Sequence, residues 1–123
     1  MTPVCYVAHP YGGDPANLTR ARRWLHWCIR WFPGRAFLAP WLEECAGGPE
    51  TPEGRELGLE HDRAIVRLCD EVWWVGGRVS EGMMVEARTL WDYWREPCVR
   101  DLTGIGAEPP GGTVELPALR EPW

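Results

Sequence analysis

The stretch PVCYVAHPYGGDPANLTRARRWLHWCIRWF occupies residues 3–32 and decides the fold class. Its first seven residues, Pro3 to His9, form a short apolar run that predicts a β-strand. A turn cluster rich in glycine and proline follows at residues 10–15. Asn17 is then expected to cap a helix that runs to about Phe32. The stretch therefore predicts one strand–loop–helix unit.

The remainder of the chain continues this alternation of strands and helices. Strands are expected at Arg35–Leu42, Glu71–Val75 and Pro97–Leu102, and helices at Arg55–Cys69 and Met83–Arg95. Strands that alternate with helices form βαβ units with right-handed crossovers. We therefore expect a small doubly wound α/β fold, Rossmann-like or flavodoxin-like, in which helices cover both faces of a parallel sheet of four to five strands.

Two segments are too rich in glycine and proline to join these elements. Residues 43–54 predict a mobile loop, and residues 104–123 predict an extended arm or frayed tail. A chain of 123 residues holds one ordinary hydrophobic core. The expected organisation is one α/β domain over residues 1–103, followed by the tail over residues 104–123.

Composition and charge exclude several function classes. The net charge of -5 argues against a nucleic-acid polymer as the partner. All 13 basic residues are arginines, which excludes Schiff-base chemistry and a Walker-type phosphate lysine. No apolar run reaches the roughly 18 residues of a membrane helix, and no signal peptide is evident. We therefore expect a cytoplasmic protein that does not bind a membrane.

The five cysteines are spread singly along the chain and show no metal-ligand spacing. Their pattern favours buried free thiols over a disulfide framework or a zinc site. No metal and no cofactor is therefore expected.

Nine tryptophans are an unusual number for so short a chain. Trp24, Trp27 and Trp31 lie beside the predicted apolar stripe of the first helix, formed by Leu18, Ala21, Leu25, Cys28, Ile29 and Phe32. This second aromatic stripe is a candidate contact between subunits of a homodimer or higher homo-oligomer. Trp91 and Trp94 are expected in the core of the last helix, and Trp73 or Trp74 in the sheet or beside a ligand.

Ligands of doubly wound folds bind at the carboxyl ends of the strands. The loops that follow the first and third strands, residues 10–14 and 76–82, are therefore expected on one rim. A phosphate at this rim could bind backbone N–H groups and a hydroxyl of Gly12, Gly13, Gly76, Gly77 and Ser80. This signal is weak because glycine-rich turns are frequent in α/β proteins. His9, at the end of the first strand, is a candidate acid or base, or a loop-capping residue.

Three acidic or phenolic side chains are candidates for chemistry at this rim. Glu86 shares a helix face with Met83 and Leu90, which points it toward the sheet. A Glu86 side chain that only complements the dipole at the helix N-terminus is equally consistent with the spacing. The pattern slightly favours an exposed Asp62 over an inward one. Alternation along the first strand places Tyr6 on the opposite sheet face from its two neighbours. Tyr6 is then either a core residue whose hydroxyl is hydrogen-bonded, or a residue whose hydroxyl orients a carboxylate at the rim.

Five motifs stand in order over residues 4–95. They are YVAHPY at residues 6–11, Ala39-Pro40, Arg55-x-x-Gly58-Leu59, HDRAIVRLCDEVWWVGG at residues 61–77 and SEGMMVEA at residues 80–87. Together they resemble the nucleoside 2-deoxyribosyltransferase-like superfamily, especially its small bacterial and phage members and the deoxynucleoside 5′-monophosphate N-glycosidases.

The resemblance implies roles for individual residues. Glu86, in a Gly-x-x-x-Glu stretch that begins at Gly82, matches the nucleophile of the characterised members. Asp62 matches the acid that assists at the base, and Tyr6 matches the tyrosine that orients the nucleophile. Ser80 stands where the transferases carry an aspartate, and it is similar to the phosphate-contacting serine of the monophosphate N-glycosidases. Arg78 is expected to help with a phosphate.

The implied function is cleavage of an N-glycosidic bond, or deoxyribosyl transfer, on a nucleoside or nucleoside 5′-monophosphate through a covalent Glu86–sugar intermediate. The small-molecule partner would be that nucleoside or nucleotide. Two alternatives stay open. One is a catalytically inactive module of the same fold that senses a nucleotide, and the other is an interaction protein that uses its tryptophan stripe.

Overall fold

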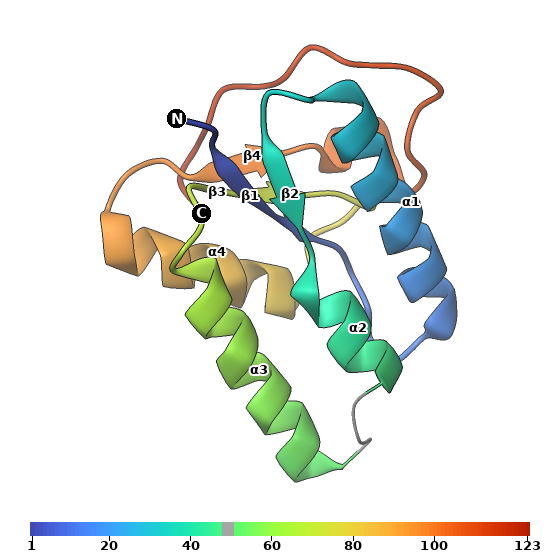
Figure 1. Ribbon diagram of the computed structural model, residues 1–123, viewed down its shortest axis with the longest axis vertical. Coiled ribbons are helices and arrows are strands. Elements are labelled where there is room, and N and C mark those ends of the chain that lie inside the picture. Colours follow the sequence, from blue (N-terminus) through green and yellow to red (C-terminus); the bar gives the residue numbers. More distant parts are fainter. Residues whose placement is uncertain (48–50) are drawn as a thin grey trace.

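The computed structural model describes residues 1–47 and 51–123 and has an α/β architecture (Figure 1). In chain order the elements are β1 (Val4–Ala8), α1 (Pro15–Trp31), β2 (Ala36–Leu38), α2 (Pro40–Gly47), α3 (Pro52–Val66), β3 (Glu71–Trp74), α4 (Glu81–Trp94), β4 (Val99–Asp101) and a short 3₁₀ helix, η1 (Thr103–Ile105). The fold class expected from the sequence is confirmed.

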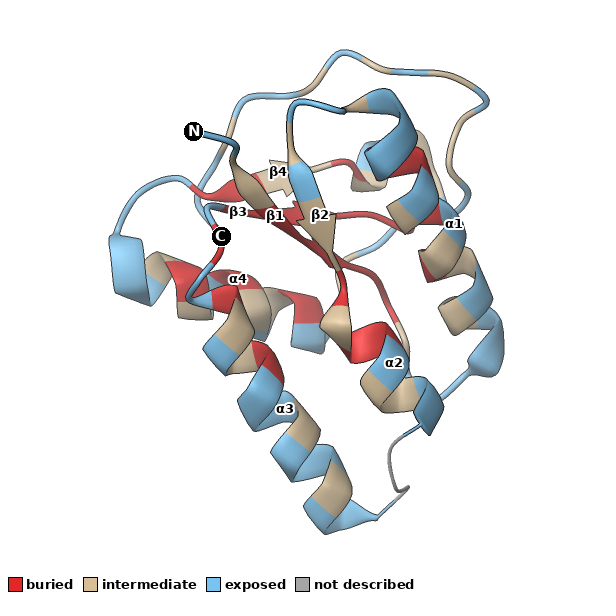
Figure 2. Cartoon of the chain, viewed as in Figure 1, coloured by how far each residue is buried: buried red, intermediate tan, exposed pale blue. Residues whose placement is uncertain are grey.

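The four strands form a parallel sheet in the order β2-β1-β3-β4. The chain leaves β1 toward one edge through α1, then reverses across β1 to reach β3. This reversal makes β1 and β3 central neighbours at the topological switch point, where ligands bind in such sheets. The sheet core is buried while the outer helix surfaces are exposed (Figure 2).

Successive tryptophans in β3 pack on opposite faces of the sheet. The ring of Trp73 contacts Phe32, just after α1, with centroids 5.3 Å apart. The indole N–H of Trp74 instead donates to the carbonyl of Met83 in α4, at 3.2 Å. Both tryptophans are fully buried. Of the two positions expected for Trp73 and Trp74, the structure shows the one in the sheet, where both rings are used in packing.

Helix α1 begins earlier than predicted and is rotated relative to the predicted stripe. Asp14, rather than Asn17, is the N-cap, and its carboxylate accepts from the backbone of Ala16 at 3.0 Å. Trp24 and Trp27 are buried, whereas Ile29, which the pattern places in the core, is 51% exposed. The large indole surfaces gain more from burial than the smaller isoleucine does.

The segment after β2 forms a helix that the sequence analysis missed. Strand β2 ends at Leu38, and Pro40 begins α2. Proline is compatible with the first helical position because that residue's N–H has no partner within the helix. The mobile loop predicted over residues 43–54 therefore contains the end of α2 and the start of α3. Its residues 48–50 lie outside the described residues.

Helix α4 begins at Glu81, with Ser80 as its N-cap, and ends at Trp94. Its buried residues are Met83, Ala87 and Leu90. Trp94 is 51% exposed, which corrects its assignment to the core. Trp91 is half-buried and packs edge-to-face against the C-terminal Trp123, with ring centroids 5.5 Å apart.

The C-terminal tail, residues 106–123, is extended but packed rather than frayed. It arches past α1 and returns to β4 (Figure 1), where Arg120 forms an antiparallel bridge with Val99. Its carbonyls accept the indole N–H groups of Trp24, at Ala107, and of Trp27, at Gly112. Trp24 and Trp27 are thus buried against the tail of the same chain, so they are not available for the subunit contact expected of them.

Two further findings concern the chain as a whole. Among the described residues no helix combines the length and apolar character needed to cross a membrane. Four of the five cysteines are buried, as expected for core thiols, and Cys45 is half-buried.

Candidate active site

The loops after β1 and β3 meet at the carboxyl edge of the sheet. The His9 ring lies against Gly76, where a side-chain Cβ would come within 2.5 Å of the ring. Gly76 also has a φ of 101°, which favours glycine. Glycine is therefore needed at position 76 for both space and backbone conformation, and it allows the two loops to touch.

Four side chains from four elements gather beneath this rim. Tyr6 comes from β1, Glu44 from α2, Asp62 from α3 and Glu86 from α4, and each influences the ionisation of at least one of the others. Tyr6 is fully buried and Asp62 is 8% exposed, whereas Glu44 and Glu86 are half-buried. The structure thus brings together the three residues that the sequence analysis singled out for chemistry.

Asp62 carries the more strongly perturbed carboxyl of the cluster. Burial raises its pKa to about 8, with further increases from the neighbouring carboxyl of Glu44 and from the charge of Glu86. Its Oδ1 atom is buried and has no hydrogen-bond partner among the described residues. At neutral pH Asp62 is therefore mostly protonated, the state required of a general acid.

Glu86 ionises more readily than Asp62. Burial raises its pKa to about 7, while the hydroxyl of Tyr6 acts in the opposite direction and favours the carboxylate. Burial and the nearby carboxylates together raise the pKa of Tyr6, which stays a neutral phenol. The hydroxyl faces Glu86 without a hydrogen bond of good geometry to any described residue. The neighbours of Asp62 and the Tyr6 hydroxyl beside Glu86 thus favour a proton on Asp62 and a negative charge on Glu86.

Glu44 is the residue of this cluster that the sequence analysis missed. It was assigned to a loop, whereas α2 directs it toward α3. There, its Oε2 lies 3.5 Å from the position that a Cβ of Gly58 would take. Asp62 follows Gly58 by one helical turn, so the Glu44 carboxyl lies along one face of α3. Pro40, four residues earlier, was the available signal because proline favours the first turn of a helix.

The predicted phosphate contacts at the start of α4 have structural uses of their own. The hydroxyl of Ser80 accepts from the backbone N–H of Met83 at 3.3 Å, which caps the helix. Its own hydrogen stays available to a ligand oxygen, because a hydroxyl both donates and accepts. Gly82 lies exposed in the first turn of α4, one turn before Glu86.

His9 is buried and neutral. Its Nδ1–H donates to the carbonyl of Pro10 at 2.6 Å, and its Nε2 is buried without a partner. Burial lowers the pKa of the ring, and the positive charges of Arg20 and Arg78 act in the same direction. His9 is thus a buried acceptor at the end of β1, rather than a cation for a phosphate.

The other predicted binding residues lie in the two rim loops. Gly12 and Gly13 adopt left-handed conformations with φ of 61° and 80°, and a Cβ at either would meet open space. Gly77, with φ of 87°, is covered by the backbone of Ala107 in the tail. Arg78 is exposed at the same rim. The rim is therefore shaped by backbone conformation on one side and by the tail on the other.

This arrangement is suited to acid-assisted nucleophilic displacement. A protonated carboxyl and an ionised one lie side by side, the division of roles that glycosidic bond cleavage requires. Within residues 1–47 and 51–123, no three His, Cys, Asp or Glu side chains are placed so as to hold a metal ion.

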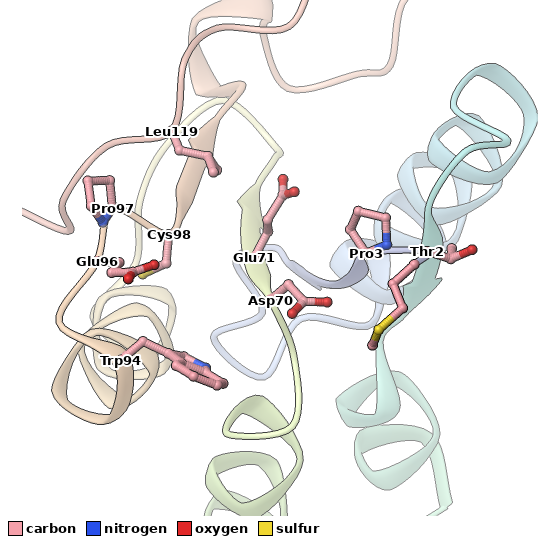
Figure 3. A pocket seen from close by; sticks show the side chains of 10 residues that line it. Thr2, Pro3, Asp70, Glu71, Trp94, Glu96, Pro97, Cys98 and Leu119 are labelled. Carbon is pink, nitrogen blue, oxygen red and sulfur yellow. The ribbon is translucent and has the colours of Figure 1, made fainter.

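A hollow of about 400 Å³ lies at the opposite, amino-terminal edge of the sheet (Figure 3). Two of its three acidic lining residues are paired within the chain. Asp70 accepts from the backbone of Val4 at 2.7 Å, and Glu71 binds Arg100 at 2.9 Å. The third, Glu96, is exposed.

Comparison with known proteins gives one result. A family model described as Domain of unknown function (DUF7768) matches residues 3–92, most of the chain. The matched segment contains Tyr6, Glu44, Asp62 and Glu86, whereas the tail lies outside it. None of the curated proteins matches the chain.

Proposed function

We propose that this chain, which belongs to the DUF7768 family, cleaves the N-glycosidic bond of a deoxynucleoside or deoxynucleoside 5′-monophosphate through a covalent sugar intermediate on Glu86. The observation that carries the proposal is the convergence of Tyr6, Asp62 and Glu86 from β1, α3 and α4, where burial raises the pKa of both carboxyls. Such surroundings allow one carboxyl to stay protonated as the acid while its neighbour is ionised as the nucleophile.

In the first step, an ionised Glu86 oxygen attacks the anomeric carbon of the sugar. The carbon–nitrogen bond breaks, and its electron pair leaves with the base. Asp62 donates its proton to the base nitrogen, so the leaving group departs neutral. A glycosyl ester on Glu86 and a free base result.

In the second step, water attacks the same carbon, and Asp62, now ionised, accepts a proton from it. The ester bond to Glu86 breaks and its carboxylate is restored. A second base in place of water would complete a transfer instead. Two inversions at one carbon give net retention of configuration.

Tyr6 and Glu44 act on the two reacting carboxyls rather than on the sugar. The Tyr6 hydroxyl lowers the pKa of Glu86 against the effect of burial, which keeps the nucleophile ionised. The neighbouring Glu44 carboxyl raises the pKa of Asp62 and thereby keeps the acid protonated. Each is a positioning residue in this proposal.

The test uses chromatography to measure the release of free base from a panel of deoxynucleosides and their 5′-monophosphates. We expect release by the native chain and its loss in Glu86→Gln. Glu81→Gln is the matched control, because Glu81 is an exposed acid in the first turn of the same helix. Mass spectrometry of the stopped reaction should show a deoxyribose adduct on Glu86.

Absence of base release across the whole panel would discard the proposal. If deoxynucleotides then raise the melting temperature without turnover, the chain is a nucleotide-binding module of this fold. If release persists in Glu86→Gln, the nucleophile has been assigned wrongly.

A further inference from the structure

Positive charge collects at one end of the rim, although the chain as a whole has a net charge of -5. Arg20 and Arg23 stand one turn apart on α1, and Arg78 follows β3. Arg20 and Arg78 both act on His9 at the end of β1. The candidate site is therefore bipolar: carboxyls gather at Tyr6, and guanidinium groups gather beyond His9.

A carboxylate of the chain's own tail occupies the arginine pair. Glu108 Oε1 lies 2.9 Å from Nε of Arg20, and its Oε2 lies 2.7 Å from a terminal nitrogen of Arg23. Each oxygen thus has its own guanidinium donor. These are charge-assisted hydrogen bonds, the mode by which arginines bind carboxylates and phosphates alike.

Two backbone carbonyls hold the tail on either side of Glu108. The carbonyls of Ala107 and Gly112 accept the indole N–H groups of Trp24 and Trp27, at 2.9 and 2.8 Å. The Glu108 side chain is 52% exposed, and its two arginine partners are also partly exposed. Exposed ion pairs are individually weak, so another anion in solution can replace this carboxylate.

We propose that Arg20 and Arg23 form a phosphate-binding subsite, that Glu108 fills it in the ligand-free chain, and that a phosphate group displaces Glu108. The tail then acts as an internal competitor for the anionic part of the ligand. The proposal rests on the proposed function only in naming a deoxynucleotide as the carrier of the phosphate. Phosphate binding itself requires no turnover.

The experiment is a titration with inorganic phosphate at low ionic strength, followed by NMR of the tryptophan indole N–H groups. The signals of Trp24 and Trp27 report the tail directly, because both groups donate to tail carbonyls. The signals of Trp41 and Trp74, which donate to Val7 and Met83, serve as internal controls for the fold.

We expect phosphate to shift the Trp24 and Trp27 signals and leave the two control signals in place. Glu108→Gln should bind phosphate at least about five-fold more tightly than the native chain, because the competing charge is gone. Arg20→Gln combined with Arg23→Gln should lose at least about ten-fold in affinity. Glu115→Gln, an exposed acid of the same tail, and Arg22→Gln, on the same helix, are the matched controls.

Equal phosphate affinity in Glu108→Gln and the native chain would overturn the proposal, as would binding that survives loss of both arginines. Absence of phosphate binding in every variant would overturn it too. Base release in the panel assay without phosphate binding here would retain the proposed function and discard this subsite.

Discussion

The indole N–H of Trp24 in α1 donates a hydrogen bond of 2.9 Å to the carbonyl of Ala107, 83 residues further along the chain. This contact ties the tail to the first helix across the face of the sheet that also carries Trp73. On the same face, Arg100 of β4 donates to the carbonyl of Pro117 at 2.7 Å. The tail thus covers part of a sheet face that a further helix covers in larger doubly wound proteins.

Trp27 provides a direct test of how much the tail contributes to stability. Trp27→Phe removes the 2.8 Å hydrogen bond to Gly112 and part of a buried ring. We expect the free energy of unfolding to fall by about 1–3 kcal/mol in urea titrations. Trp31→Phe, at a partly exposed position of the same helix, should change it by less than about 0.5 kcal/mol. Equal effects of the two changes would show that the tail contact contributes nothing.

Glu71 pairs with two arginines in the interior, so we expect that removing its charge lowers the free energy of unfolding. Its Oε1 accepts from Trp73 at 3.0 Å and from Arg100 at 2.9 Å, and Arg35 lies 3.6 Å from Oε2. Glu71→Gln leaves buried guanidinium charge uncompensated, so we expect a loss of about 3–5 kcal/mol in the free energy of unfolding.

The matched control for Glu71 is Glu43→Gln, which breaks the exposed pair with Arg22. An exposed pair contributes about 0–1 kcal/mol, so this variant should unfold almost like the native chain. If Glu71→Gln is no worse than Glu43→Gln, solvent reaches the buried pair.

The alternation of strands and helices was predictable because short apolar runs and glycine-rich turns encode it locally. Helix α2 was not, because Pro40 marks both a strand end and a first helical turn, and only packing decides between them. Missing α2 meant missing Glu44. The sequence pattern slightly favoured an exposed Asp62, which is wrong because Asp62 is 8% exposed. For Glu86 the spacing to Leu90 left an inward position and a role at the helix dipole equally open, so helix packing had to decide between them.

The role of Trp24 and Trp27 was not accessible from local pattern. A second aromatic stripe on a helix indicates a partner, and the sequence does not tell whether that partner is another subunit or a distant part of the same chain. The tail contains too few periodic apolar positions to predict its path. Its contacts depend on backbone carbonyls, which every residue has, so they leave no signature in the sequence.

The pKa values of the two carboxyls predict a narrow pH optimum for base release. Glu86 must be ionised, so the rate should fall as the pH drops below about 7. Asp62 must be protonated, so the rate should also fall as the pH rises above about 8. We expect a bell-shaped profile of kcat/KM with its maximum between these values. A rate that keeps rising to pH 10 would remove Asp62 as the acid.

Tyr6→Phe separates positioning from packing, because the ring is kept and the hydroxyl is lost. The hydroxyl lowers the pKa of Glu86, so its removal should move the acidic limb of the pH profile to higher pH. At pH 7 we expect base release to fall about 10-fold or more, with partial recovery near pH 8. An acidic limb that stays in place would mean that the Tyr6 hydroxyl does not act on Glu86.

Asp62→Asn should remove base release while stabilising the fold at alkaline pH. In the folded chain the Asp62 pKa is raised from 3.8 to about 8, so the folded state holds a proton that the unfolded state has released over that window. Stability therefore declines as the pH rises from about 4 to about 8. Asparagine is neutral in both states and lacks this decline. We expect a gain in unfolding free energy of about 1–3 kcal/mol at pH 8 and little or none near pH 4.

Urea titrations of Asp62→Asn at pH 5 and pH 8 measure this difference, and Asp92→Asn, an exposed acid on α4, is the matched control. The pH dependence matters more than the size of the gain at either pH, because repacking of asparagine against Glu44 affects both measurements alike. A gain that is the same at pH 5 and pH 8 would mean that Asp62 ionises normally in the folded chain. It would then lack the proton that the proposed acid must donate, even if base release were lost.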